Sequence, residues 1–300
     1  MANRLTNTRY ADDILLYAKS APELQSMIES LFAELRLIGL DANPVKTNIL
    51  TTDEHFTSNP SFIDIDGEFV DVISRDRSHK YLGRMINLSS DHRVNLELTF
   101  RKKCAWAAFH KHRRTLLNHD ISLGLRLKLF DSVVSPAALF CLHTLPISKS
   151  QLTSFGACQR RMLRSICGWR RIDGEDWADT MRRMKRRVQV GMMLHYVMSW
   201  EQRLHKSVWS YAKYLTHSNQ NSPWCAMVRW RPDTLHDASL PQQPRRHPGR
   251  PRKRWDDDMR RFLQAKFNSS DNWLDLACRN YGAFHDCESE FVVWMMTNTQ

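Results

Sequence analysis

The chain contains 300 residues, and its 42% hydrophobic content can bury one sizeable core or two smaller ones, which argues against wholesale disorder. Lys and Arg residues number 44 against 32 Asp and Glu residues, so the formal charge of +12 at pH 7 favours a polyanionic partner. A solvated basic face on an ordinary globular protein explains the same excess, and charge alone leaves both interpretations open.

Cysteine usage and hydropathy indicate a reducing compartment. The seven Cys residues form an odd set without the spacing of a disulfide framework, and no apolar run near the amino end resembles a signal peptide. Charged residues interrupt every hydrophobic segment before it reaches the roughly 20 residues that a membrane-spanning helix needs. We therefore expect an intracellular protein, cytoplasmic or nuclear or both, with no part embedded in a membrane.

The first predicted element is a β-hairpin with acidic residues at its turn. The segment Tyr10–Asp13, which reads Tyr-Ala-Asp-Asp, follows a short stretch rich in Thr and Arg. It precedes the apolar run Ile14–Tyr17. Two strand-like stretches on either side of a short polar turn are typical of a hairpin.

A helix and several strands are predicted next. Ser20 and Glu23 form a capping box, and apolar residues then recur at helical spacing up to Gly39. Later stretches have the pattern of strands, and Asp66-Gly67 between two of them is a favourable hairpin turn. These strand-like stretches are 48–50, 62–65, 69–73 and 81–86.

From about residue 91 the strand signals fade and helical patterns take over. Apolar residues recur at helical spacing in 123–134 and in 152–166, whereas a polar, Pro-rich stretch beginning at residue 231 has no periodicity. We therefore predict an α+β fold in four parts. They are an α+β domain in 1–90, a mainly helical domain in 91–230, a basic Pro-rich linker in 231–254 and a small helical segment in 255–300.

The two carboxylates at the first turn suit metal-dependent chemistry. Adjacent carboxylates at a tight turn can hold Mg²⁺, a cation that takes oxygen ligands and shares its shell with substrate phosphates. In a two-metal phosphoryl transfer, one ion activates the attacking hydroxyl and the other neutralises charge on the leaving pyrophosphate. A solvated Asp-Asp turn is the alternative for such a pair taken alone.

Several motifs in a fixed order make a family resemblance specific. Tyr10–Asp13 resembles the Tyr-Ala-Asp-Asp signature of reverse transcriptases. The helix over 22–37, the segment 39–47 and Tyr81–Gly83 are similar to the successive palm motifs of LINE-type, non-LTR retrotransposon enzymes. The helical stretch 127–169 is similar to their thumb. The resemblance implies a partial palm of short antiparallel strands and a helix in 1–90, a thumb and connection region in 91–230, and RNA-directed DNA polymerase activity.

The resemblance also implies roles at the acidic turn. Asp12 would be the principal ligand of Mg²⁺ or Mn²⁺, and Asp13 would have a lesser coordinating or structural part. Tyr10 would contact the primer or the template. RNA and DNA are therefore the implied partners.

Two further motifs acquire roles in the same way. Lys46 would lie near the triphosphate, where a cation can protonate or neutralise the departing pyrophosphate. Tyr81, Leu82 and Gly83 would hold the primer end, with Gly83 permitting close approach of the backbone. The alternatives are an ordinary exposed loop lysine at 46 and a plain strand at 81–83.

The polymerase site is expected to be incomplete. A complete reverse transcriptase supplies another metal-binding Asp from an earlier palm strand, together with finger residues that cradle the nucleotide. Residues 1–9 contain no acidic residue. We therefore expect a truncated or partial copy that is inactive alone, and a separate upstream palm-and-fingers chain is a candidate partner.

A basic segment near position 250 is a candidate nucleic-acid contact. Gly249–Pro251 resembles an AT-hook core, which lies extended in a narrow A·T-rich minor groove. Phosphate binding and a nuclear-localisation signal are the other interpretations, and the segment is also similar to a basic stretch near the end of LINE-type reading frames. The residues expected to bind nucleic acid are Arg245, Arg246, Arg250, Arg252, Lys253 and Arg254.

The remaining Cys, His and Trp residues carry weaker signals. Cys278, His285 and Cys287 lie where some related elements have a zinc knuckle, but their spacing does not match, so we assign no zinc. Trp169 stands beside two arginines and could stack on exposed bases, whereas core packing accounts for most of the other Trp residues.

Two other interpretations stay open beside the polymerase fragment. One is a nucleic-acid-binding protein without chemistry, in which Asp12 and Asp13 are vestigial. The other is an unselected product of a decayed element, which folds poorly because its palm sheet has an open edge.

Overall fold

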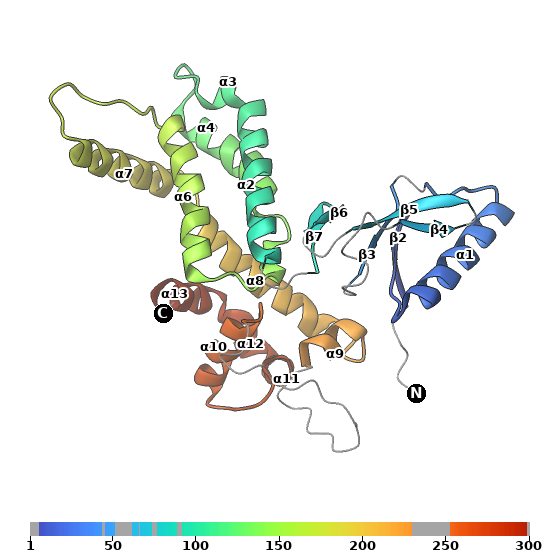
Figure 1. Cartoon of the computed structure of the whole chain (residues 1–300). Coiled ribbons are helices and arrows are strands. Elements are labelled where there is room, and N and C mark those ends of the chain that lie inside the picture. Colours follow the sequence, from blue (N-terminus) through green and yellow to red (C-terminus); the bar gives the residue numbers. More distant parts are fainter. Residues whose placement is uncertain are drawn as a thin grey trace. The chain divides into compact units, whose positions relative to one another are not determined.

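The computed structural model describes residues 6–43, 46–51, 62–65, 67–73, 77–88, 92–229 and 253–298. The chain divides into two compact units, Met1–Glu97 and Leu98–Gln300. The first combines strands with helix, and the described part of the second is helical (Figure 1). The expected α+β class is therefore confirmed, with helix predominating, while its assignment to a palm and a thumb stays a prediction.

The predicted acidic hairpin is present at the start of the described chain. Strands β1 (Asn7–Tyr10) and β2 (Asp13–Leu16) pair in antiparallel register, with Tyr10 opposite Asp13. The two-residue turn between them requires a positive φ of 52° at Ala11. Such a backbone angle is uncommon outside Gly, Asn and Asp. The turn therefore presents Asp12 at the tip of the hairpin.

The predicted helix is α1 (Ala21–Leu37). Its N-terminus is capped because the Ser20 hydroxyl accepts a hydrogen bond from the Glu23 backbone N–H, and the Glu23 carboxylate accepts one from the Lys19 backbone N–H at 2.7 Å. The helix ends before Gly39, whose φ of +75° is readily adopted by a residue without a side chain. The Ser20 cap and the end of the helix at Gly39 agree with the sequence, while the Glu23 carboxylate bonds to the N–H of Lys19.

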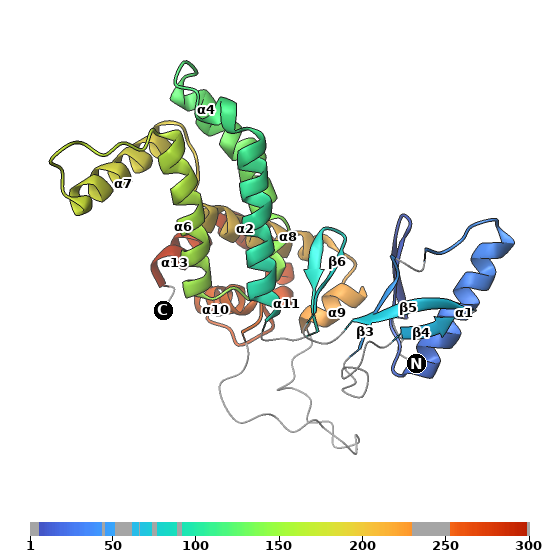
Figure 2. The same ribbon diagram turned by 45° about the horizontal axis from the view of Figure 1, so that its top comes forward.

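A three-stranded sheet packs against α1. Strands β3 (Asn48–Leu50), β5 (Glu68–Ile73) and β4 (Phe62–Ile65) lie in the order β3-β5-β4, with β3 parallel and β4 antiparallel to β5. Figures 1 and 2 show α1 running along this sheet. The core between them consists of four buried residues, with Leu16 of β2 packed against them: Ile28, Phe32, Ile49 and Val70.

The stretch 81–86, predicted as one strand, is instead the turn and second arm of a hairpin. Strands β6 (His79–Tyr81) and β7 (Arg84–Ile86) pair antiparallel through a two-residue turn at Leu82 and Gly83. Both turn residues have positive φ, 47° and 78°, as a type I′ turn requires. The strand prediction was wrong because the apolar Leu82 conceals a turn that only its backbone angle reveals.

The second unit is built from helices. Helix α2 (Arg93–Lys111) spans the boundary between the units. The helices that follow are α3 (Arg113–Leu116), α4 (Leu123–Leu129), the π-helical turn η2 (Phe130–Val134), α5 (Ser135–Leu139), the 3₁₀ turn η3 (Leu142–Thr144), α6 (Lys149–Ile166), α7 (Trp177–Leu194), α8 (Trp200–His217), α9 (Pro223–Arg229), α10 (Asp257–Phe267), α11 (Trp273–Arg279), α12 (Tyr281–Asp286) and α13 (Glu288–Asn298).

Helix α8 is the centre of this unit. Trp200 at its start stacks with Phe130 and Phe155 from η2 and α6. Trp209, nine residues further along the same helix, packs on Phe284 of α12 and Phe291 of α13. The segment 255–300 is helical where it is described, and it lies in the same compact unit as the helices of 98–229.

Across 6–43, 92–229 and 253–298, which contain every described helix, none is both long and apolar enough to cross a bilayer.

Candidate functional site

The tip of the β1–β2 hairpin exposes the residues that the sequence singled out. Tyr10 is 67% exposed, and Asp12 and Asp13 are also exposed. Because Asp12 occupies the turn and Asp13 begins β2, the two carboxylates are adjacent on the rim of one short hairpin. They are accessible to a cation or to a substrate that approaches the tip.

The donor set at this tip is consistent with one side of a magnesium site. Carboxylate oxygens are the ligands that Mg²⁺ prefers, and water and substrate phosphates commonly complete its six-oxygen shell. Within the described ranges, however, no group of three or more His, Cys, Asp and Glu side chains comes together at a place that could hold a metal ion. A two-metal centre here therefore needs carboxylates beyond the described residues.

Lys46 lies in a local turn between α1 and β3. Its backbone N–H donates to both the backbone carbonyl and the side-chain Oδ1 of Asn43, each at 3.1 Å. Its side chain is exposed, and in the part of the chain that the structure describes no hydrogen bond or ion pair joins it to Asp12 or Asp13. The structure thus does not bring this lysine into contact with the acidic pair.

Tyr81, Leu82 and Gly83 come together at the turn of the β6–β7 hairpin, which is a different sheet from β1–β2. The hairpin is tied to α2 because the Met85 backbone N–H donates to the buried Glu97 carboxylate at 2.7 Å. The geometry gives Gly83 a conformational role, since its φ is positive.

The basic segment lies largely outside the described residues, which include neither Arg245, Arg246, Arg250 nor Arg252. Its last two cations are described, and both hold internal contacts. Lys253 forms an ion pair with Asp258 at 2.8 Å and donates to the Ile147 carbonyl at 3.0 Å. Arg254 pairs with the buried Asp256 at 3.2 Å.

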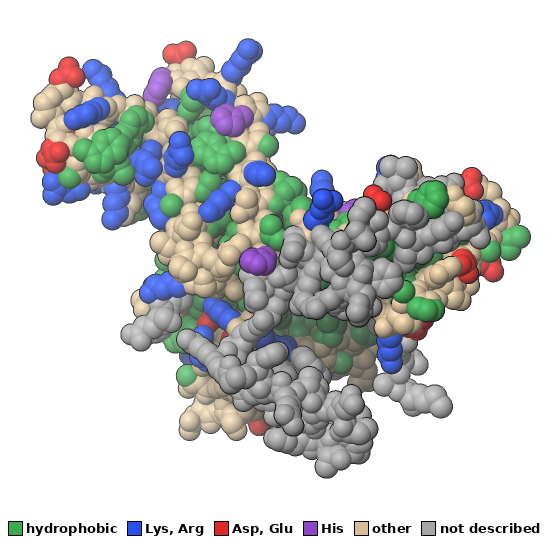
Figure 3. Space-filling model, in the orientation of Figure 1, with side chains coloured by type: hydrophobic (Ala, Val, Ile, Leu, Met, Phe, Trp, Pro, Cys, Tyr) green, Lys and Arg blue, Asp and Glu red, His purple; other side chains and the backbone are tan. Residues whose placement is uncertain are grey.

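A basic surface that the sequence analysis did not single out lies on α7. The run Arg182–Arg187 reads Arg-Arg-Met-Lys-Arg-Arg, with its Met184 buried. Figure 3 shows Lys and Arg side chains gathered over the region that holds α6 and α7 in Figure 1. A K/R-rich six-residue run is a recognised signal for a nucleic-acid patch, so this surface was detectable in the sequence.

The loop before α7 is fixed by one of these arginines. Arg183 donates from Nε and Nη2 to the two carboxylate oxygens of Glu175, at 2.8 and 2.7 Å, and also to the Arg170 carbonyl. These hydrogen bonds from Arg183, with a further one from the Thr180 hydroxyl, lower the pKa of Glu175 to about 2. Glu175 is therefore ionised at neutral pH, and Arg183 is neutralised by it.

The same loop presents two exposed aromatic rings. Trp169 and Trp177 are 40% and 57% exposed, and their rings meet edge to face with centroids 5.7 Å apart. Arg170 and Arg171 follow Trp169 directly. The ring of Trp169 is thus accessible at the surface, and its stacking on bases stays a prediction.

Three more cations follow one another along α6. Arg161 lies over the Trp106 ring at 5.7 Å, and Arg160 forms an ion pair with Glu201. Burial, followed by the charges of Arg160 and Arg161, lowers the pKa of Arg164 from its ordinary value. Arg160 and Arg161 are therefore near enough to Arg164 to act on its charge.

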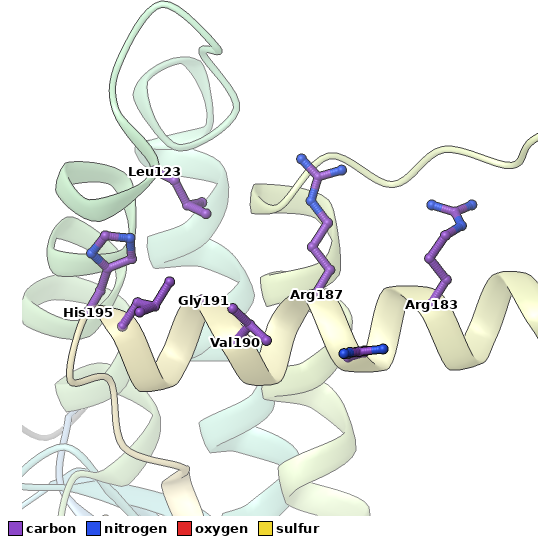
Figure 4. Close-up of a pocket in the computed structure, with 8 residues that line it drawn as sticks. Leu123, Arg183, Arg187, Val190, Gly191 and His195 are labelled. Atoms are coloured by element: carbon purple, nitrogen blue, oxygen red, sulfur yellow. The ribbon is translucent and has the colours of Figure 1, made fainter.

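A hollow of about 320 Å³ lies between α7 and the start of α4 (Figure 4). In the figure, Arg183, Arg187 and His195 extend from α7 on the side that faces Leu123 of α4. The surface of the hollow is mostly apolar, with cationic side chains at its edge. We call it the α7 hollow, and its lining residues are Leu123, Arg183, Arg186, Arg187, Val190, Gly191, Leu194 and His195.

Comparison with known proteins finds a similarity over about half of the chain. It is similar to an uncharacterized transposon-derived protein of Caenorhabditis elegans, with 32% identity over 142 residues. The match covers 45% of this chain and 47% of that protein, so the chain spans about half the length of this relative. No protein-family model matches the chain, and no solved structure matches it significantly. The similarity is to a protein whose own name records an origin in a transposon.

Proposed function

We propose that this chain is part of an RNA-directed DNA polymerase of a LINE-type retrotransposon. The observation that carries the proposal is the β1–β2 hairpin, because it exposes Tyr10, Asp12 and Asp13 at one tip. A transposon-derived relative supports the same origin. In this proposal the two carboxylates supply oxygen ligands to Mg²⁺ or Mn²⁺, and the ion supplies charge neutralisation during nucleotidyl transfer.

The elements after the hairpin support the proposal by their order. The capped helix α1, the turn that holds Lys46 and the β6–β7 hairpin occur in the order of the palm motifs that the sequence resembles. In the proposed enzyme Lys46 acts near the triphosphate, and Tyr81–Gly83 supports the primer end. In the same enzyme the remaining metal ligands come from another polypeptide, such as an upstream palm-and-fingers chain.

A second candidate function is nucleic-acid binding without catalysis. It is favoured by the second unit, where Arg186 and Arg187 of α7 are exposed without an ion-pair partner among the described residues. Trp169 and Trp177 are exposed in the same unit. In this alternative the acidic turn is vestigial, and RNA or DNA binding depends on neither Asp12 nor a divalent cation.

Primer extension tests the proposal directly. The purified chain would be assayed on an RNA template with a DNA primer and Mg²⁺ or Mn²⁺, alone and mixed with an upstream palm-and-fingers polypeptide. We expect extension on mixing, and we expect Asp12→Asn to reduce it to background because a neutral amide is a poor ligand for a hard cation. Asp120→Asn is the matched control, since Asp120 is also an exposed carboxylate in a turn and lies outside every motif to which the resemblance gives a role.

The outcomes separate the two candidates. Extension that survives Asp12→Asn contradicts the metal role of the hairpin. An absence of extension in every mixture, together with RNA binding that resists EDTA and Asp12→Asn, supports the binding protein instead. Thermal unfolding serves as a check on folding, because exposed Asp12 should tolerate Asn without loss of stability.

A further inference from the structure

We propose that the α7 hollow receives one nucleotide of a single-stranded nucleic acid. The base lies against the apolar side chains of Leu123, Val190 and Leu194, and the adjoining phosphates lie on Arg186 and Arg187. The proposal deepens the polymerase function by assigning a strand-binding site. Its test measures binding rather than synthesis, so the two can fail separately.

The shape of the hollow follows from the helical repeat. Arg183, Arg187, Gly191 and His195 are spaced four residues apart, so they lie along one side of α7. Gly191 in the middle of this row is buried, and a Cβ there would lie 3.6 to 3.8 Å from side chains of α4 and the end of α6. These are ordinary van der Waals distances, so α7 packs against α4 at this point and forms the base of the hollow.

The floor and edge of the hollow differ in polarity. Val190 and Leu194 are 41% and 62% exposed, so the apolar floor is open to a ligand. A nucleobase offers a flat apolar face of the kind that such a floor can cover. The volume of about 320 Å³ is within the range of small-ligand pockets.

The charges at the edge are of two kinds. Arg183 is paired with Glu175, so it is fixed and neutralised. Arg186 and Arg187 are exposed, and among the residues that the structure describes neither has a hydrogen-bond or ion-pair partner. Two uncompensated guanidinium groups beside an apolar floor are complementary to a phosphate next to a base.

The residues around Gly168 lie beside the cationic edge of the hollow. At Gly168 a Cβ would lie 3.1 Å from the His119 ring and 4.0 Å from Nη2 of Arg187. Trp169 follows Gly168 and exposes its ring. A strand that leaves the hollow past Arg187 therefore meets an aromatic surface on which a neighbouring base can stack.

These features favour a single strand over other anionic partners. In a duplex the base faces are covered by stacking, so the apolar floor would stay empty. An acidic peptide supplies charge but no flat apolar group next to it. Single-stranded RNA and single-stranded DNA share the required chemistry, and a comparison of their affinities distinguishes them.

The first test measures the salt dependence of binding. Anisotropy of a labelled oligouridylate and of its DNA counterpart would be titrated with the full chain at several salt concentrations. For Arg186→Gln/Arg187→Gln we expect weaker binding. The negative slope of log K against log salt should become less steep by about 1.4, as the loss of two single-strand phosphate contacts predicts. Lys111→Gln/Lys185→Gln removes the same formal charge from two exposed positions, with Lys185 on the opposite side of α7 and Lys111 at the end of α2, and should leave the slope unchanged.

The second test measures the contribution of the base. Leu194→Ser should weaken binding without changing the salt slope, and an abasic oligonucleotide should bind more weakly than the intact one. Tighter binding of either RNA or DNA supports the site and identifies its strand. Equal effects of the two double variants, equal affinity for abasic and intact strands, or tighter binding of a duplex would each overturn the proposal. Circular dichroism verifies that the variants are folded.

Discussion

Arg183 of α7 holds the carboxylate of Glu175 in the preceding loop through two hydrogen bonds, at 2.8 and 2.7 Å. A paired geometry of this kind is specific to arginine, whose planar guanidinium matches the two carboxylate oxygens. The pair connects the exposed Trp169 loop to the helix that carries the α7 hollow. It also decides which arginine of the basic run is unavailable to a ligand.

The first prediction concerns the order of this loop. Arg183→Lys should retain the charge but lose the paired geometry, so backbone amides in 170–176 should exchange faster with solvent while those of α8 are unaffected. Hydrogen exchange followed by mass spectrometry measures both. Arg182→Lys is the control, because Arg182 pairs only with Asp179 on its own helix among the described contacts. Unchanged exchange in Arg183→Lys would show that the loop is held by other contacts.

The same pair predicts a pH dependence for the loop. The pKa of Glu175 is lowered to about 2 by its hydrogen bonds from Arg183, below its ordinary value of 4.5. A lowered carboxylate pKa contributes stability above the ordinary value and loses it as pH falls through the lowered one. Protection of 170–176 should therefore decline between about pH 4.5 and pH 2, and Glu175→Gln should remove that dependence.

His205 predicts a loss of stability at mildly acidic pH. Burial in α8 lowers its pKa from 6.5 to about 4; the charge of Asp258 opposes this shift, and that of Lys253 adds to it. The unfolded chain takes up the proton near pH 6.5 and the folded chain only near pH 4. Stability should therefore fall as pH drops through that window, by on the order of 3 kcal/mol. Urea unfolding of the wild type and His205→Gln measures the difference.

The control for this experiment is His217→Gln, which changes an exposed histidine at the end of the same helix. Its stability curve should follow the wild type. If His205→Gln also runs parallel to the wild type between pH 6.5 and 4, the acid sensitivity arises elsewhere in the chain.

Replacing the buried Gln159 by an apolar residue of similar size should strongly reduce the stability of the second unit. This residue is 1% exposed; its amide donates to the Met198 carbonyl at 3.1 Å and accepts from the Trp200 backbone N–H at 2.8 Å. Gln159→Leu fills similar space but leaves both backbone groups without this partner, so it should destabilise the unit by about 2–4 kcal/mol. Gln189→Leu on the exposed side of α7 should cost far less. Denaturant unfolding decides, and similar costs for both changes would contradict the role of the buried amide.

Two substitutions in the β6–β7 turn should change the stability of the hairpin in opposite directions. Leu82 and Gly83 both have positive φ, so Gly83→Ala should destabilise the hairpin by about 1 kcal/mol, whereas Leu82→Asn should stabilise it by a fraction of that amount. Amide exchange of residues 79–86 measures the hairpin directly. Faster exchange in both variants would be inconsistent with a type I′ turn.

Local elements of the first unit could be predicted because their causes are local. The Ser20 cap and the turn at Gly67 depend on groups within a few residues of each other, and both are present as expected. The strand predicted over 81–86 failed for the converse reason. Leu82 has the composition of a strand, and only the pairing of β6 with β7 requires its positive φ.

The acidic pair was evident in the sequence because Asp12 and Asp13 are adjacent in the chain, and a hairpin turn places adjacent residues at one tip. Its relation to Lys46 could not be predicted, because that distance depends on how β1–β2 and β3 pack around α1. The pairing of the cations also depends on the fold. Composition showed an excess of positive charge but not which groups are compensated.

The sequence by itself determined the α+β class, the acidic hairpin, the capped helix and the basic character of the chain, since these depend on residue type and short spacing. Only the tertiary structure decided that Arg183 is occupied by Glu175 and Lys253 by Asp258, while Arg186 and Arg187 stay without a partner among the described residues. The physical reason is that a charge is compensated by whatever packing brings within about 4 Å, and this is a property of the folded chain.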